Sequence, residues 1–144
     1  MLVSKILQSK ATQGVLTIAP DATVADAVAE LGARRIGALV VSSDGRRAEG
    51  ILSERDVVRD MAKAGAGALD GRVAELMTRE VQVASPGEDA ESVLGRMTAG
   101  RFRHMPVEED GLLIGLISLG DVVKARLSEV SMEKDALQAM VAGH

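Results

Sequence analysis

The chain has 144 residues, of which 47% are hydrophobic, and Phe102 is its single aromatic residue, so the core must be aliphatic. Its length suits one ordinary domain or two small repeats that share a core. The absence of cysteine excludes a disulfide scaffold, an iron–sulfur cluster and a thiolate nucleophile. Two histidines are too few for a histidine-rich zinc site, and the net charge of −4 argues against a dedicated nucleic-acid-binding protein.

The N-terminal residues 1–8 lack the basic stretch and the long apolar run of a signal peptide. No apolar run of the sequence reaches the roughly 20 residues that a membrane span requires. We therefore expect a cytoplasmic protein that has neither a membrane nor a nucleic acid as its partner.

The first half of the chain alternates between strand-like and helix-like patterns. A short apolar run ends at Pro20, and proline suits a strand end because it lacks a ladder donor. Thr23 and Asp26 have the spacing of a capping box, and apolar residues then recur at helical intervals. Two apolar runs flank Asp44-Gly45, which is a strong hairpin signal. These patterns predict strand, helix, strand, strand and helix at residues 16–19, from 23, 36–42, 50–52 and from 53 onward.

The second half of the chain repeats these patterns. A shift of 66 positions places Pro20 on Pro86 and Asp44-Gly45 on Asp110-Gly111, and after the loss of one residue a shift of 65 places Ser53 on Ser118. Residues 73–78 likewise echo residues 3–8. The second set of elements is predicted at residues 81–84, from 89, 105–108, 113–117 and from 118 to 127.

We therefore predict an α+β protein built from two tandem β-α-β-β-α repeats that form one pseudo-twofold module. The first repeat, with its N-terminal segment and a longer loop at residues 9–14, spans residues 1–63, and the second spans residues 72–127. Residues 64–71 are small and glycine-rich, which indicates a flexible linker, and their glycine spacing fits neither the dinucleotide fingerprint nor the P-loop. Residues 128–144 are expected to be a helical tail that packs its apolar face on its own domain or on a sister subunit.

Two seven-residue motifs stand at equivalent positions of the repeats. Gly50-Ile-Leu-Ser-Glu-Arg-Asp56 and Gly115-Leu-Ile-Ser-Leu-Gly-Asp121 share a glycine, two apolar residues, a serine and, three residues later, an aspartate. Together with Phe102-Arg-His-Met-Pro-Val107, they make the chain resemble a pair of cystathionine β-synthase (CBS) domains from about residue 3 to about residue 127. The resemblance implies a free-standing regulatory module, not an enzyme, that binds adenine nucleotides in clefts between its repeats, forms a homodimer and acts on an unidentified regulated protein.

Each motif ends in a serine and an aspartate at a predicted helix start, and this pair has two interpretations. One is a capping box, in which the two side chains satisfy the first backbone N–H groups of the helix. The other is ligand binding, in which the helix start and the serine attract a phosphate while the aspartate accepts hydrogen bonds from ribose hydroxyls. Arg55 supplies a positive charge in the first copy, whereas the second copy has Gly120 at that position.

A basic cluster stands out in the acidic second half of the chain, residues 73–144, whose net charge is −5. It is either a solvated face with salt bridges to Glu108 and Glu109 or a phosphate clamp in the cleft of the second copy. We favour the clamp, because Arg103-His104 leads into a strand that the CBS family uses at its cleft. Since the first copy has Gly37-Ala38 at those positions, we expect its cleft to be less basic and the two sites to differ in affinity or ligand. The members of the cluster are Arg96, Arg101, Arg103 and His104.

Two other functions would use the same residues. His104, Ser118 and Asp121 supply the residue types of a hydrolase triad, but Ser118 lies in no Gly-x-Ser-x-Gly elbow and the first copy has Ala38 in place of the histidine. A repeated structural or binding role explains both copies, so no catalytic residue is assigned. The remaining alternative is a module that has lost its ligand and either binds a partner protein or is purely structural. His104 by itself is open to two interpretations, a packed structural histidine or a pH-sensitive ligand contact.

The arginines favour a ligand with at least one phosphate over S-adenosylmethionine, whose sulfonium is positive. AMP is the first choice, followed by ATP or NAD(H), and the two clefts hold either separate mononucleotides or the halves of a dinucleotide. Without Trp or Tyr, aliphatic side chains must enclose the adenine, and Phe102 is the one ring that can approach it. No metal ligand is assigned. The expected ligand-site residues are Ile18, Pro20, Ser53, Arg55, Asp56, Val83, Arg103, His104, Met105, Pro106, Ser118 and Asp121.

Overall fold

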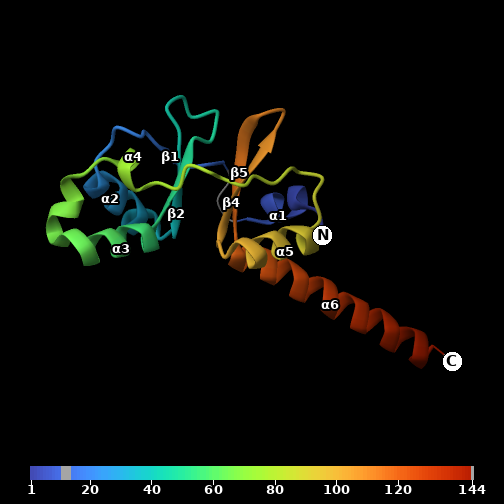
Figure 1. Ribbon diagram of the computed structural model, residues 1–144. Helices are drawn as coiled ribbons and strands as arrows, with labels where there is room; N and C mark the ends of the chain where they lie inside the picture. Colours follow the sequence, from blue (N-terminus) through green and yellow to red (C-terminus); the bar gives the residue numbers. More distant parts are fainter. Residues whose placement is uncertain (11–13, 144) are drawn as a thin grey trace.

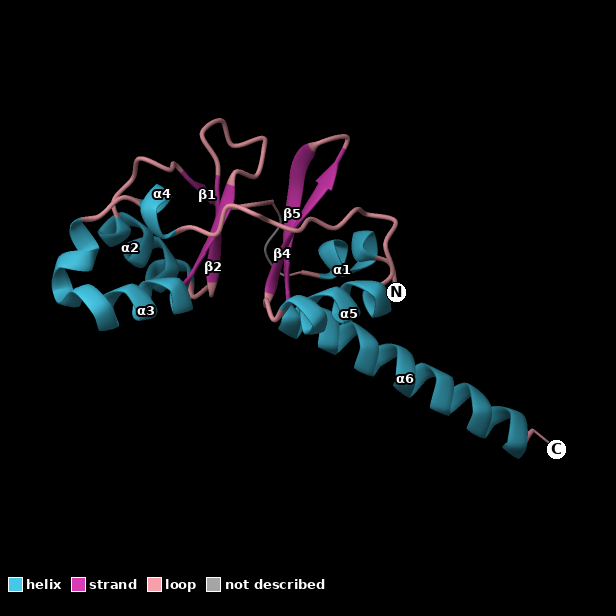
Figure 2. Ribbon diagram, in the orientation of Figure 1, coloured by secondary structure: helices cyan, strands magenta, loops and turns pink. Residues whose placement is uncertain are grey.

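The structure is a computed structural model that describes residues 1–10 and 14–143. Two repeats of helices and strands lie side by side, with a long C-terminal helix that leaves the body of the molecule (Figures 1 and 2). The α+β class and the two-repeat organisation are therefore confirmed. In chain order the elements are α1 (Val3–Ser9), β1 (Thr17–Ile18), α2 (Val24–Arg34), β2 (Ala38–Val41), β3 (Gly50–Ser53), α3 (Glu54–Ala64), the 3-10 helix η1 (Gly65–Asp70), α4 (Val73–Leu76), α5 (Ala90–Gly100), β4 (His104–Glu109), β5 (Leu112–Ser118) and α6 (Leu119–Ala142).

The two repeats differ in their sheets. In the first repeat β1 pairs parallel with β2, and β2 pairs antiparallel with β3. In the second repeat β4 and β5 form an antiparallel pair, and the strand expected at residues 81–84 is reduced to a single parallel bridge between Ala84 and Val107. The physical reason is Pro106, which stands where the first repeat has Val40 and has no N–H to donate to a neighbouring strand.

Several turns and helix starts formed where the local sequence predicted them. Capping boxes begin α2, α3 and α6, and in each the serine or threonine side chain accepts a hydrogen bond from the backbone N–H three residues later. Asp110 and Gly111 both have positive φ, at 54° and 76°, which matches the tight turn predicted between β4 and β5. Asp89, in contrast, stands at the start of α5 without capping it, because its carboxylate accepts a hydrogen bond from the N-terminal amine at 3.1 Å.

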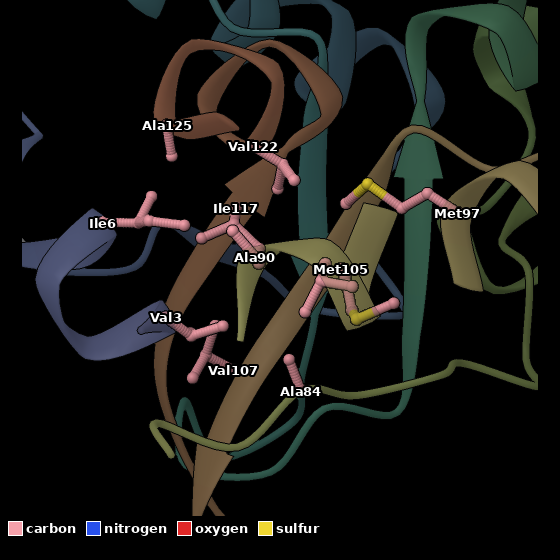
Figure 3. Close-up of a cluster of buried hydrophobic side chains, with 11 residues drawn as sticks. Val3, Ile6, Ala84, Ala90, Met97, Met105, Val107, Ile117, Val122 and Ala125 are labelled. Atoms are coloured by element: carbon pink, nitrogen blue, oxygen red, sulfur yellow. The ribbon is translucent and has the colours of Figure 1, made fainter. Parts of the chain in front are cut away.

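Each repeat has its own aliphatic core. The short helix that precedes each repeat in the chain, α1 or α4, packs on the core of the other repeat, so these lead helices are exchanged. Val3 and Ile6 of α1 are buried in the core of the second repeat, beside Val107 and Ile117 (Figure 3). Val73 of α4 is buried in the core of the first repeat. The backbone repeats this exchange, because Val3 N–H donates to Glu88 O and Val73 N–H donates to Ala22 O, both at 2.9 Å. The N-terminal segment assigned to the first repeat therefore packs on the second.

The segment between the repeats is ordered, contrary to the flexible linker expected at residues 64–71. Ala64 ends α3, and residues 65–70 continue directly as η1. Ala68 is buried, and Leu69 packs against the core of the first repeat, so small apolar residues hold this segment in place. Of the loop expected at residues 9–14, residues 11–13 lie outside the described part of the chain.

The C-terminal helix packs on its own domain only at its start. Val122 and Ala125 of α6 are buried in the core of the second repeat. Beyond them the helix extends away from the body of the molecule (Figure 1) and its apolar residues are solvent-exposed. Of the two alternatives for the tail, packing of its apolar face on its own domain is not observed in the described residues, and packing on a sister subunit stays a prediction. His144 lies outside the described residues. The exposed apolar residues of this part of α6 are Leu127, Val130, Met132, Leu137, Met140 and Val141.

Candidate functional site

Two clefts lie between the repeats, and each takes its walls from both of them. The larger cleft, of about 510 Å³, is lined by residues 37, 51, 53–56 and 59 of the first repeat and by residues 78, 80–82 and 100–104 of the second. The smaller cleft, of about 270 Å³, is lined by residues 104, 116, 118 and 121 of the second repeat and by residues 10, 14–16 and 35–38 of the first. Because equivalent segments line both clefts, the pseudo-twofold relation between the repeats also relates the clefts. The larger volume is typical of a small-molecule site.

The serine and aspartate of each motif stand at a helix start on the wall of one cleft. Ser53 N–H and its hydroxyl donate to Asp56 Oδ2 at 2.9 and 3.0 Å, and Asp56 N–H donates to the Ser53 hydroxyl at 3.3 Å. In the second motif, Ser118 N–H donates to Asp121 Oδ2 at 2.9 Å, and Asp121 N–H donates to the Ser118 hydroxyl at 3.1 Å. Both capping boxes therefore form, and in both the capping bonds use Oδ2 of the carboxylate.

The larger cleft is rich in arginine. Four arginines and three carboxylates line it, which leaves an excess of positive charge on a chain whose net charge is −4. The carboxylates are balanced only in part by direct contacts, since Arg59 Nη1 lies 3.9 Å from Asp56 Oδ1 and is itself largely exposed. The charged residues of this cleft are Arg55, Arg59, Arg101, Arg103, Glu54, Asp56 and Glu80.

The arginine cluster belongs to a different cleft from the one expected. Arg101 and Arg103 line the larger cleft with Ser53 and Asp56, not the smaller cleft with Ser118 and Asp121. The expectation that the first motif has the less basic cleft is therefore wrong, because each motif faces the β-strand start of the other repeat.

Arg96 takes no part in the larger cleft. Its guanidinium contacts Glu88 at 2.9 Å and donates to the Val83 carbonyl at 3.0 Å. The salt bridges considered with Glu108 or Glu109 do not form within the described residues. Neither a solvated face nor a clamp therefore accounts for all four members of the cluster.

The smaller cleft contains two cations that the sequence analysis did not identify, Lys10 and Arg35. Lys10 Nζ donates to Asp121 Oδ2 at 2.9 Å and to the Leu116 carbonyl at 2.7 Å. Partial burial by itself raises the pKa of Asp121, but the Ser118 N–H and the Lys10 ammonium outweigh it and hold the pKa below its usual value. Arg35 could have been found from the repeat, since it aligns with Arg101, whereas Lys10 lies in a segment without an aligned cation.

His104 lines both clefts and stands between them, beside Gly37. A Cβ atom on Gly37 would lie only 3.2 Å from His104 Nε2, so the glycine lets the ring fill this place. Burial lowers the pKa of His104, with Lys10 and Arg103 acting in the same direction and Glu54 and Asp121 opposing it. The imidazole is therefore neutral near pH 7.

The hydrolase-type triad considered for His104, Ser118 and Asp121 is not assembled. The Asp121 carboxylate is bonded to Ser118 N–H and Lys10, and the Ser118 hydroxyl accepts the capping bond. Within the described residues, His104 forms no hydrogen bond with either of them.

Five of the expected ligand-site residues line neither cleft. Met105 is fully buried in the core of the second repeat and Ile18 is buried in that of the first, because these strand positions point inward. Leu16 and Val81, each two residues earlier than the residues expected, line the clefts instead. Phe102 lines the larger cleft, as expected of the one aromatic ring. The residues that line neither cleft are Ile18, Pro20, Val83, Met105 and Pro106.

Within residues 1–10 and 14–143, no three His, Cys, Asp or Glu side chains group in a way that could hold a metal ion. None of the helices in these residues combines the length and the apolar character needed to cross a membrane.

Comparison with known proteins identifies a family. The CBS domain model matches residues 3–63 and 73–128. The mitochondrial CBS domain-containing protein CBSX3 of Arabidopsis thaliana is 34% identical over 148 residues, which cover 98% of this chain and 72% of that protein. A CBS-domain containing protein from Agrobacterium tumefaciens has a crystal structure with a TM-score of 0.83 and 41% identity, covering 88% of this chain and 99% of that one. The CBS domain pair of protein MJ0100, crystallised in complex with 5′-methylthioadenosine and S-adenosyl-L-methionine, has a TM-score of 0.78 at 21% identity and covers 90% and 98% of the two chains.

Proposed function

The chain belongs to the CBS domain family, and from that premise we propose that it is a regulatory, non-catalytic module that binds adenine nucleotides in the two clefts between its repeats. The observation that carries this proposal is the excess of positive charge in both clefts of an acidic chain. A phosphate-bearing ligand is the simplest complement to such a charge.

The larger cleft is our first choice for AMP. In this pose the phosphate contacts the arginines that surround the start of α3, and Asp56 accepts hydrogen bonds from the ribose through Oδ1, which the capping bonds do not use. The adenine lies against Ile51, Val81 and Phe102, the apolar side chains of that wall. The pose needs no stacking on Trp or Tyr, residues that the chain lacks.

An adenosine group is further supported by the MJ0100 domain pair, whose two ligands both contain one. The charges of the present clefts differ from what S-adenosyl-L-methionine requires, because its sulfonium would meet arginines. We therefore place AMP first, ATP or NAD(H) next, and S-adenosyl-L-methionine last.

The output of the module is proposed to pass through α6. Asp121 in the first turn of this helix lines the smaller cleft, and the same helix extends past the body with its exposed apolar residues. A shift at the cleft would therefore reach a surface suited to a sister subunit or to a regulated protein. We propose a homodimer in which this surface is covered.

A partner-binding module without a ligand is the second candidate. It is favoured by the capping boxes, which already satisfy the serine and aspartate of each motif without any ligand. In that case the exposed face of α6 would be the functional surface.

Two measurements separate the candidates. The chain has no Trp or Tyr, so an adenine-like absorption band in the freshly purified protein would reveal a captured nucleotide, and a second band at longer wavelength would indicate NADH. Calorimetric titration with AMP, ATP, NADH and S-adenosyl-L-methionine then ranks the ligands. A blank spectrum with no heat of binding would favour the partner-binding module, and tighter binding of S-adenosyl-L-methionine than of AMP would reverse the ranking.

A further inference from the structure

Three residues other than glycine have positive φ among the described residues, and two of them are arginines at the same place in the two repeats. Arg35 ends α2 with φ of 54°, and Arg101 ends α5 with φ of 56°. The third, Asp110, has φ of 54° in the turn between β4 and β5. A left-handed conformation is costly for a residue with a Cβ atom, and glycine is the usual choice at the end of a helix.

The helix ends require this backbone conformation but not an arginine side chain. Arg35 N–H donates to the Leu31 carbonyl, and Arg101 N–H donates to the Met97 carbonyl, so the cap is made by the main chain alone. Glycine would make the same bonds without steric penalty. Both arginine side chains are exposed, and within residues 1–10 and 14–143 neither guanidinium forms an ion pair. The two side chains therefore form neither a cap hydrogen bond nor an ion pair that would stabilise the folded chain.

What the two arginines have in common is their position in the clefts. Arg101 lines the larger cleft opposite the start of α3, and Arg35 lines the smaller cleft opposite the start of α6. Each comes from the repeat that does not contribute the serine–aspartate motif of its cleft. The two repeats therefore share both the left-handed backbone conformation at this position and the placement of its arginine in a cleft.

The charge balance of each cleft depends on its arginine. Without Arg101, the larger cleft would have three arginines and three carboxylates. Without Arg35, the described residues of the smaller cleft would have only Lys10 and Asp121, which are already ion-paired at 2.9 Å. Arg35 alone therefore accounts for the positive excess of the smaller cleft, and Arg101 is one of the four arginines that produce the excess of the larger cleft.

We propose that Arg35 and Arg101 are the phosphate-binding residues of the smaller and the larger cleft, and that they select phosphorylated ligands over uncharged adenosine. The inference builds on the proposed function, because it assumes that an adenine compound enters the clefts. A guanidinium is suited to this role because its planar donors can contact two phosphate oxygens at once. Residues with a strained backbone conformation cluster at functional sites, and these two arginines stabilise neither their helix nor an ion pair, which favours a role in ligand binding.

The test combines affinity with stability in the full chain. The variants Arg35→Gly and Arg101→Gly are titrated with AMP and with adenosine by calorimetry, and their melting temperatures are measured without ligand. We expect AMP affinity to fall about tenfold in the affected cleft, as for loss of a hydrogen bond to a charged group, while adenosine affinity stays constant. We expect the melting temperature to rise by about 2–4 °C, because the backbone strain is relieved.

Asp110→Gly is the matched control, since Asp110 has the same backbone conformation but lies outside both clefts. It should leave the affinities for AMP and adenosine unchanged. Arg101→Lys tests the planar group, and should recover part of the AMP affinity through charge alone.

The possible failures can be told apart. If the unaltered chain binds neither AMP nor adenosine, the proposed function fails and this inference fails with it. If the unaltered chain binds AMP and the glycine variants bind it equally well, only the assignment of the arginines is overturned. A parallel loss of adenosine and AMP affinity, or a lower melting temperature, would make the arginines structural and would also overturn it.

Discussion

Replacing Asp121 with alanine should destabilise the chain more than replacing Asp56 with alanine. The two aspartates make equivalent capping boxes. Only Asp121 has a cation at hydrogen-bonding distance, with Lys10 Nζ at 2.9 Å, whereas Arg59 lies 3.9 Å from Asp56. Arg59 is also 69% exposed, so solvent screens its attraction to Asp56.

The expected difference can be estimated from these contacts. Loss of a capping interaction costs about 1 kcal/mol, and both variants lose one. The side chains of Lys10 and Asp121 are 29% and 25% exposed, so their ion pair is partly shielded from water, and we assign it about 1 kcal/mol more. In a chain of this length, 1 kcal/mol corresponds to about 2–4 °C in melting temperature, so Asp121→Ala should melt about 2–4 °C below Asp56→Ala.

Scanning calorimetry at neutral pH measures both variants, and a double-mutant cycle with Lys10→Met isolates the ion pair. Within the cycle, Lys10→Met should cost less in the Asp121→Ala background than in the unaltered chain. Equal melting temperatures of the two aspartate variants, together with a coupling energy of zero, would refute the reasoning.

Three further predictions test the cores, the shared histidine and the clefts. Ile6→Ala should lower the free energy of unfolding, measured in urea, by about 2–4 kcal/mol, since α1 is part of the core of the second repeat. The control Leu127→Ala, at an exposed position, should change the stability of the monomer little. A loss for Ile6→Ala as small as that of the control would contradict the exchanged packing. Because burial lowers the pKa of His104, the unfolded chain takes up this proton first, and stability should decline as the pH falls below about 6.5; His104→Gln should flatten the decline, and an unaltered slope would speak against it. In an AMP titration, Asp56→Asn should lose more affinity than Asp121→Asn because the larger cleft has more arginines, and equal losses would exclude this asymmetry.

Features that depend on residues close together in the chain were predictable. The capping boxes of Thr23 and Ser53 and the turn at Asp110-Gly111 follow from spacings of three residues or fewer, and all three formed. The two-repeat organisation was predictable for a different reason, since the chain resembles itself at shifts of 65 and 66 positions. The strand expected at residues 81–84 was one exception, because its pairing depends on Pro106 in a distant strand.

By itself, the sequence determined that two equivalent units exist, and that each carries a serine–aspartate pair at a helix start. Only the tertiary structure decided which surfaces of the two units meet. Docking of the repeats exchanges the lead helices, brings Arg101 and Arg103 to the motif of Ser53, and sets Lys10 against Asp121. Arg101 and Arg103 lie 48 and 50 positions from Ser53, and Lys10 lies 111 positions from Asp121, so no local spacing encodes these contacts. They arise because each repeat buries its apolar surface and leaves its polar helix starts facing the other repeat.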